Sequence, residues 1–161
     1  LGVYGQTKAA ADAVVATVPR HYIVRTSWVI GEGKNFVRTM ASLAERGVAP
    51  SVVDDQIGRL TFTDEIARGI RHLLETEAEF GMYNLTGAGS PASWAEIAGE
   101  VYELSGHDRG QVTGVSTDTY FASATGPVAP RPRWSVLDLA KIEATGFAPR
   151  DWRESLRDLL G

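Results

Sequence analysis

The residues best suited to chemistry are Tyr4 and Lys8, which stand four positions apart in an alanine-rich segment. On a helix, residues i and i+4 project from the same face, about one turn apart. A free tyrosine loses its proton near pH 10, so acid–base use near neutral pH requires a stabilised phenolate. A lysine ammonium one turn away provides that stabilisation and can also bind a cofactor ribose. Such pairs also arise by chance on helices, so the rest of the sequence has to support this interpretation.

Other residues have side chains suited to phosphate. Asn35 and Phe36 open a predicted helix, where free backbone N–H groups and the helix dipole favour a diphosphate. Asn35 is equally suited to capping that helix. Arg131 offers a forked guanidinium and Ser135 a short donor, although a solvated arginine in a loop is the simpler interpretation of Arg131.

Three further residues could bind a sugar or a base. Trp28 lies at the end of a predicted strand, where it is either a ring-covering contact or a core tryptophan. Asp55 and Gln56 follow another strand and offer carboxylate and amide groups, although a polar turn before Gly58 would also explain them.

Alternating helices and short apolar strands would position these residues. The pattern predicts an α/β fold with a partly parallel sheet. Helices are expected at residues 4–17, 35–45, 63–75, 93–106, 137–145 and from 151 onward, and strands at 22–29, 50–53, 81–86 and 112–115. Thr63 or Asp64 is expected to cap the third helix and Ser93 the fourth, while residues 122–133 should form an extended loop.

Composition narrows the function classes. The 161 residues have a net charge of −4, and the basic residues are dispersed, which argues against nucleic acid as a partner. The chain has no cysteine, so disulfides and thiolate metal sites are excluded. The three histidines lack metal-ligand spacing, and no apolar run has membrane-spanning length. We therefore expect a cytoplasmic protein that does not bind a membrane.

Residues 4–8 resemble the catalytic helix of the extended short-chain dehydrogenases/reductases. Within that superfamily, further segments resemble the dTDP-4-dehydrorhamnose reductases, in order along nearly the whole chain: residues 24–29, 33–40, 53–58, 131–137 and 152–156. The resemblance implies the C-terminal part of one reductase subunit with a Rossmann-type fold. Residues 1–30 and 48–86 would belong to the Rossmann side, and residues 31–47 and 87–161 mainly to a small mixed substrate-binding region.

The resemblance also implies an activity: NADPH-dependent reduction of the C4 ketone of dTDP-4-dehydro-L-rhamnose to dTDP-L-rhamnose, with NADH as the alternative cofactor. Tyr4 would donate the proton, Lys8 would assist it, and Arg25, Thr26 and Ser27 would join them at the cofactor. Trp28, Asn35, Phe36, Asp55, Gln56, Arg131 and Ser135 would bind the sugar nucleotide.

The family's glycine-rich nucleotide loop has no counterpart in this sequence, so we expect the cofactor-binding half to precede residue 1 and the chain alone to be inactive. The resemblance admits a Mg²⁺ ion, for which no ligand is assignable, a homodimer, and a fused or separate 3,5-epimerase partner. Two alternatives stay open: another extended-family epimerase or dehydratase, and a non-catalytic regulatory relative.

Overall fold

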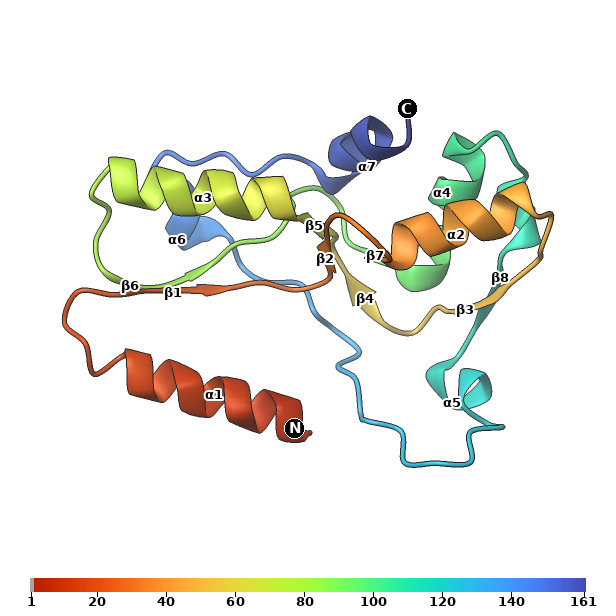
Figure 1. Cartoon of the computed structure of the whole chain (residues 1–161), viewed down its shortest axis with the longest axis horizontal. Coiled ribbons are helices and arrows are strands. Elements are labelled where there is room, and N and C mark those ends of the chain that lie inside the picture. The colour runs from red at the N-terminus through yellow and green to blue at the C-terminus, as the bar shows by residue number, and fades with distance from the viewer. Residues whose placement is uncertain (1) are drawn as a thin grey trace.

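A computed structural model describes residues 2–161 and has mixed α/β architecture (Figure 1). Along the chain, the elements are α1 (Val3–Val15), β1 (Tyr22–Arg25), β2 (Val29–Ile30), α2 (Phe36–Glu45), β3 (Ser51–Val53), β4 (Ile57–Gly58), β5 (Thr61–Phe62), α3 (Thr63–Glu75), β6 (Gly81–Asn84), β7 (Ala92–Ser93), α4 (Trp94–Leu104), the 3₁₀ turn η1 (Arg109–Gln111), β8 (Thr113–Val115), α5 (Thr117–Tyr120), α6 (Ala140–Glu143) and α7 (Trp152–Leu160).

The strands join in pairs. β1 with β6, β2 with β5, and β3 with β8 run parallel, whereas β4 and β7 run antiparallel. Each parallel pair is formed by strands far apart in sequence, with at least one helix between them, as parallel connections require. The expected α/β fold with partly parallel pairing is confirmed.

Two hydrophobic clusters form the core. The first gathers α2, α4 and α7 around β3 and β5, with Val37, Leu60, Ile97, Val101, Trp152 and Leu156 at its centre. The second lies between α3, β6 and α6 and contains Leu73, Tyr83, Leu85, Leu139, Ile142 and Phe147. Val52, Leu60 and Phe62 belong to the first cluster, whereas Leu139, Ile142 and Phe147 belong to the second.

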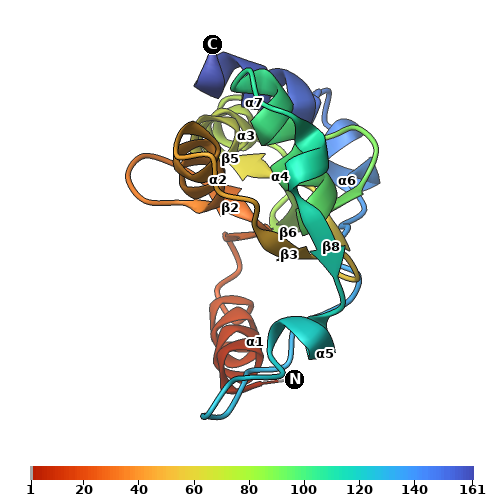
Figure 2. The ribbon, with the colours of Figure 1, turned by 90° about the vertical axis from the view of Figure 1, so that its right-hand side faces the viewer.

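Helix α1 lies apart from both clusters and has no buried residue (Figures 1 and 2). Arg25, at the end of β1, connects to it through Nε and Nη2, which lie 2.9 and 2.8 Å from Asp12 Oδ2. At its other end, a Cβ built on Gly2 would lie 3.9 Å from Pro130 Cδ. The start of α1 therefore lies close to the loop that leads to Arg131.

Several sequence-based boundaries were wrong. The strand expected at residues 22–29 is split into β1 and β2, because Trp28 adopts a left-handed φ of 49°. The helix expected at 137–145 begins only at Ala140, whose N–H binds Asp138 Oδ1 at 2.7 Å. Helix α3 has Phe62 at its N-cap with no side-chain cap, so neither Thr63 nor Asp64 has the expected role. Helix α5 was not predicted, whereas the extended loop after it is confirmed.

The helices described in residues 2–161 include none with the length and apolarity to cross a bilayer.

Ser93 caps α4 as expected and provides a stability test. Its Oγ accepts a hydrogen bond from the Glu96 N–H at 3.1 Å, and Glu96 Oε2 accepts one from the Ser93 N–H at 2.6 Å. Ser93→Ala should lower the free energy of unfolding by about 1 kcal/mol, measured by urea denaturation. Ser105→Ala, at the other end of α4, is the matched control and should change it by less than about 0.5 kcal/mol. Equal losses from both variants would show that the cap does not stabilise α4.

Candidate active site

A pocket of about 440 Å³ lies between α2, β3, α4 and α5. Its wall is mainly apolar, with a few polar groups, which is the usual character of a small-molecule site. It brings together three of the predicted substrate-binding residues, Phe36, Gln56 and Arg131. The remaining lining residues are Thr39, Met40, Leu43, Pro50, Ser51, Val52, Val53, Trp94, Tyr120 and Phe121.

A larger and more open hollow, of about 740 Å³, lies on the hydrophilic side of α2. Lys34, Arg38 and Arg46 give it a positive charge, but it contains none of the predicted site residues. Because the smaller pocket combines apolar walls with converging polar groups, it is the better candidate for binding a nucleotide base and diphosphate.

Three aromatic rings from different elements meet beside the pocket. The Trp28 and Trp94 rings are stacked, with centroids 3.8 Å apart and planes 19° apart. The Phe36 ring lies 4.6 Å from Trp94 at a tilt of 57°. Trp28 is therefore neither a pocket-lining residue nor a fully buried core residue, but is connected to the pocket through Trp94.

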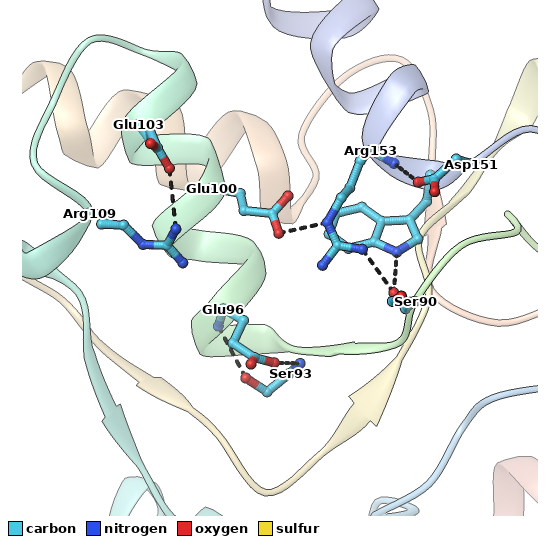
Figure 3. Close-up of polar contacts among 9 residues, drawn as sticks. Ser90, Ser93, Glu96, Glu100, Glu103, Arg109, Asp151 and Arg153 are labelled. Carbon is cyan, nitrogen blue, oxygen red and sulfur yellow. Dashed lines mark hydrogen bonds and ion pairs between the residues drawn. The ribbon is translucent and has the colours of Figure 1, made fainter.

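Polar contacts at its start and along its length hold α4 in place, as Figure 3 shows. Trp94 is the first helical residue, directly after the capping box formed by Ser93 and Glu96. Farther along α4, Glu100 Oε1 accepts a hydrogen bond from Arg153 Nε of α7 at 2.9 Å. Arg153 Nη1 also donates to the Ser90 carbonyl at 3.0 Å, just before β7. These contacts fix α4, and with it the Trp94 ring, relative to the first cluster.

Asp55 holds α5 in place. Its Oδ1 accepts hydrogen bonds from the Thr117 N–H at 3.0 Å and the Thr117 hydroxyl at 2.6 Å. Gln56 Nε2 donates to the same hydroxyl at 3.0 Å. The Thr117 hydroxyl, together with its N–H and the charge of Arg133, lowers the pKa of the Asp55 carboxyl below its ordinary value despite opposing desolvation. The Asp55 side chain thus anchors the helix that carries Tyr120 to the pocket.

Other predicted substrate residues also have internal partners. The Asn35 side chain caps α2, accepting from the Arg38 N–H at 3.0 Å and donating to the Gly31 carbonyl at 2.7 Å. The Ser135 N–H donates to the Ile57 carbonyl at 2.8 Å, and the Ser135 carbonyl accepts from the Ser27 hydroxyl at 3.2 Å. Asn35 therefore caps α2, which was one of its two expected roles, and Ser135 aligns its segment with β4.

Tyr4 and Lys8 lie on the first turns of α1, and both side chains are exposed, Tyr4 to 77%. Of the three residues predicted at the cofactor, Arg25 is paired with Asp12 and Ser27 donates to Ser135. Thr26 is exposed. Tyr4 and Lys8 are therefore accessible to a ligand, whereas the side chains of Arg25 and Ser27 already have partners within the chain.

Within residues 2–161, no group of three or more His, Cys, Asp or Glu side chains comes together as a metal site.

Sequence reasoning missed Trp94, Thr117, Tyr120 and Thr61. The capping box at Ser93 could have indicated that Trp94 starts a helix, but nothing local connects it to Trp28, 66 positions earlier. Thr61 is fully buried, donating from Oγ1 to the Ser27 carbonyl at 2.6 Å and from N–H to the Trp28 carbonyl at 3.1 Å. Only the folded chain brings these residues together.

The chain is similar to known proteins along nearly all of its length. A "probable dTDP-4,6-dihydroxy-2-methyloxan-3-one 4-ketoreductase" of Streptomyces antibioticus is 40% identical over 96% of this chain and 52% of its own. A dTDP-4-dehydrorhamnose reductase of Mycolicibacterium smegmatis is 36% identical over 99% of this chain and 48% of its own. The crystal structure of dTDP-4-dehydrorhamnose reductase from Bacillus anthracis in complex with NADP superposes with a TM-score of 0.84 at 31% identity, covering 98% of this chain and 54% of that one.

The chain thus spans about half the length of the relatives it matches. Its fold corresponds to the matched half of an extended short-chain dehydrogenase/reductase. The family model described as the RmlD substrate binding domain matches residues 1–161. The chain belongs to the RmlD substrate binding domain family.

Proposed function

We propose that this chain supplies the proton donor and the sugar-nucleotide pocket of a reductase that converts dTDP-4-dehydro-L-rhamnose to dTDP-L-rhamnose with NADPH. The observation that carries the proposal is an accessible Tyr4–Lys8 pair on α1 in the same chain as a nucleotide-sized pocket. The reductase names of the two relatives support the reaction class, and the NADP bound to the Bacillus anthracis enzyme supports the cofactor.

In this reaction Tyr4 donates its phenolic proton to the C4 ketone oxygen as the carbon is reduced. The Lys8 ammonium, one helical turn away, stabilises the phenolate that remains. NADPH, when bound, supplies the hydride. General acid catalysis of this kind contributes about 10²- to 10⁴-fold to the rate.

The pocket orients the substrate for this step. The apolar wall formed by Phe36, Met40 and Tyr120 suits a base, and Arg131 suits a diphosphate because its guanidinium can bind two phosphate oxygens at once. The loop that carries Arg131 also passes close to Gly2, just before α1, since a Cβ built on Gly2 would lie 3.9 Å from Pro130 Cδ. A ligand held by Arg131 would therefore extend toward the helix that carries Tyr4.

The cofactor would meet this chain at Lys8 and Thr26, whose side chains are exposed, and at the backbone around Arg25 and Ser27. Within the described residues β1 pairs only with β6, so its other edge is open to a further parallel strand. A nucleotide-binding half that pairs there would place NADPH beside α1. The proposed division remains 1–30 and 48–86 for the Rossmann side, with 31–47 and 87–161 mainly for substrate.

We further propose that the enzyme acts in the cytoplasm, where NADPH is available. A 3,5-epimerase, fused to it or separate, would supply the ketone substrate. A homodimer is part of the same proposal, and so is NADH as an alternative reductant.

Tyr4→Phe tests the proton donor directly. In the full-length protein that contains this chain, kcat for ketone reduction should fall about 10²- to 10⁴-fold while KM changes much less. Tyr102→Phe is the matched control, because the buried Tyr102 hydroxyl donates to the Val48 carbonyl at 2.7 Å, far from α1 in sequence. It should lower stability by about 1 kcal/mol and leave kcat unchanged. Near-normal reduction by Tyr4→Phe with cofactor bound would contradict the assignment.

Asp55→Ala tests whether α5 shapes the pocket. Loss of both hydrogen bonds to Thr117 should loosen α5 and raise KM for the sugar nucleotide roughly threefold to tenfold at pH 7. Because the pKa of Asp55 is lowered in the folded protein, its contribution is present at neutral pH and is lost only below about pH 4. Asp54→Ala, at the exposed neighbouring position, should leave KM unchanged. A similar rise in both variants would argue against the anchor.

A further inference from the structure

The indole ring of Trp28 is covered on both faces. Trp94 stacks on one face, with ring centroids 3.8 Å apart. A Cβ built on Gly58 would lie 2.7 Å from Trp28 Cε2 and 2.8 Å from both Cδ2 and Cζ2, which are its three nearest atoms. Cδ2 and Cε2 form the bond shared by the two rings, so a point close to all three atoms lies over a ring face. This face is the one opposite Trp94. On the other face the stacked Trp94 ring would be among the atoms nearest to the built Cβ, but all three nearest atoms belong to Trp28.

A sugar therefore has no free face of Trp28 on which to stack, contrary to the expectation that Trp28 covers the sugar ring. What remains available is the ring edge with its Nε1–H. Among residues 2–161, no acceptor meets this N–H, and the nitrogen is not one of the buried unpaired atoms. By contrast, the fully buried Trp152 donates from Nε1 to the Ser90 carbonyl at 2.9 Å. The Trp28 N–H has no partner among the described residues and is not sealed in the interior, so it is available to a ligand.

The backbone of Trp28 is held in an unfavourable conformation. Its φ of 49° is rare for a bulky residue, and such strain persists only where the surroundings enforce it. Thr61 enforces it with two hydrogen bonds, from Oγ1 to the Ser27 carbonyl and from N–H to the Trp28 carbonyl. The Cα–Cβ direction of Trp28 is therefore fixed, and only the plane of its ring needs a further constraint.

Trp94 supplies that constraint from an element that is itself fixed. The capping box sets the start of α4, and the Phe36 ring contacts Trp94 at 4.6 Å. Gly58 has no side chain, so the opposite face of Trp28 can rest on its backbone. Any larger residue there would displace the ring.

We propose that Trp94 is a positioning residue: with Gly58 it clamps the Trp28 indole edge-on, so that the Trp28 Nε1–H donates a hydrogen bond to an oxygen of the substrate's sugar. This inference rests on the proposed function, because it takes the sugar nucleotide as the ligand. It assigns Trp94 a role that depends on Trp28, beyond lining the nucleotide pocket.

A double-mutant cycle on dTDP-L-rhamnose binding, by calorimetry with the full-length protein, separates the two roles. Trp28→Phe keeps a ring in the clamp and removes the N–H, and Trp94→Leu keeps apolar bulk and removes the stack. Each should weaken binding roughly threefold to tenfold, and the double variant should bind no worse than Trp28→Phe alone. Trp94→Phe, which keeps a stacking ring, should restore near-normal binding.

If the fold-loss in binding of the double variant equals the product of the two single losses, the inference is overturned, because Trp94 then acts on the ligand independently of Trp28. The stack has its own signature: the far-ultraviolet circular dichroism couplet of two stacked indoles should be present in the parent protein and absent in Trp94→Leu. Its absence from the parent would also overturn the inference. If the parent binds dTDP-L-rhamnose with this coupling but reduces no ketone, the proposed function fails and the positioning role stands. A parent that does not bind the ligand contradicts both.

Discussion

The backbone turn at Trp28 is the constraint on which the rest of the site depends. The chain leaves the second hydrophobic cluster through β1 and enters the first through β2, and the left-handed φ of Trp28 redirects it between them. Thr61, at the start of β5, stabilises this turn from a strand that pairs in parallel with β2. One local conformation therefore sets both the connection between the clusters and the direction in which the indole points.

The site is built from residues whose binding groups are left free once folding is complete. Arg25, Asn35, Asp55 and Ser135 all have internal partners, and their contribution is to hold segments in place. Tyr4, Arg131 and the edge of Trp28 remain exposed or unpaired, which is what a ligand requires. The two sets differ in chemistry as well: the structural set consists of short or paired polar side chains, whereas the free set is mainly aromatic.

The sequence predicted those parts of the molecule that depend on local patterns. The capping box at Ser93 and the helix that starts after Asn35 were predicted from signals within a few residues. The split of the strand at Trp28 was not, because its cause is a pair of hydrogen bonds from Thr61, 33 positions later. Asp55 was predicted to bind the substrate, and its hydrogen bond to Thr117 was not predicted, because Thr117 lies 62 positions away and no local rule connects the two. The Trp28–Trp94 stack was missed for the same reason.

The proposed activity is net reduction of a sugar ketone, with the proton supplied from α1. The most direct measurement gives the full-length protein NADPH deuterated at the transferable position, together with dTDP-4-dehydro-L-rhamnose, and locates the deuterium in the product by NMR. The account predicts stoichiometric deuterium at C4 of the sugar, with one NADPH oxidised per molecule reduced. Conversion of the sugar without deuterium at C4, as expected of an epimerase that returns the substrate's own hydride, would contradict it.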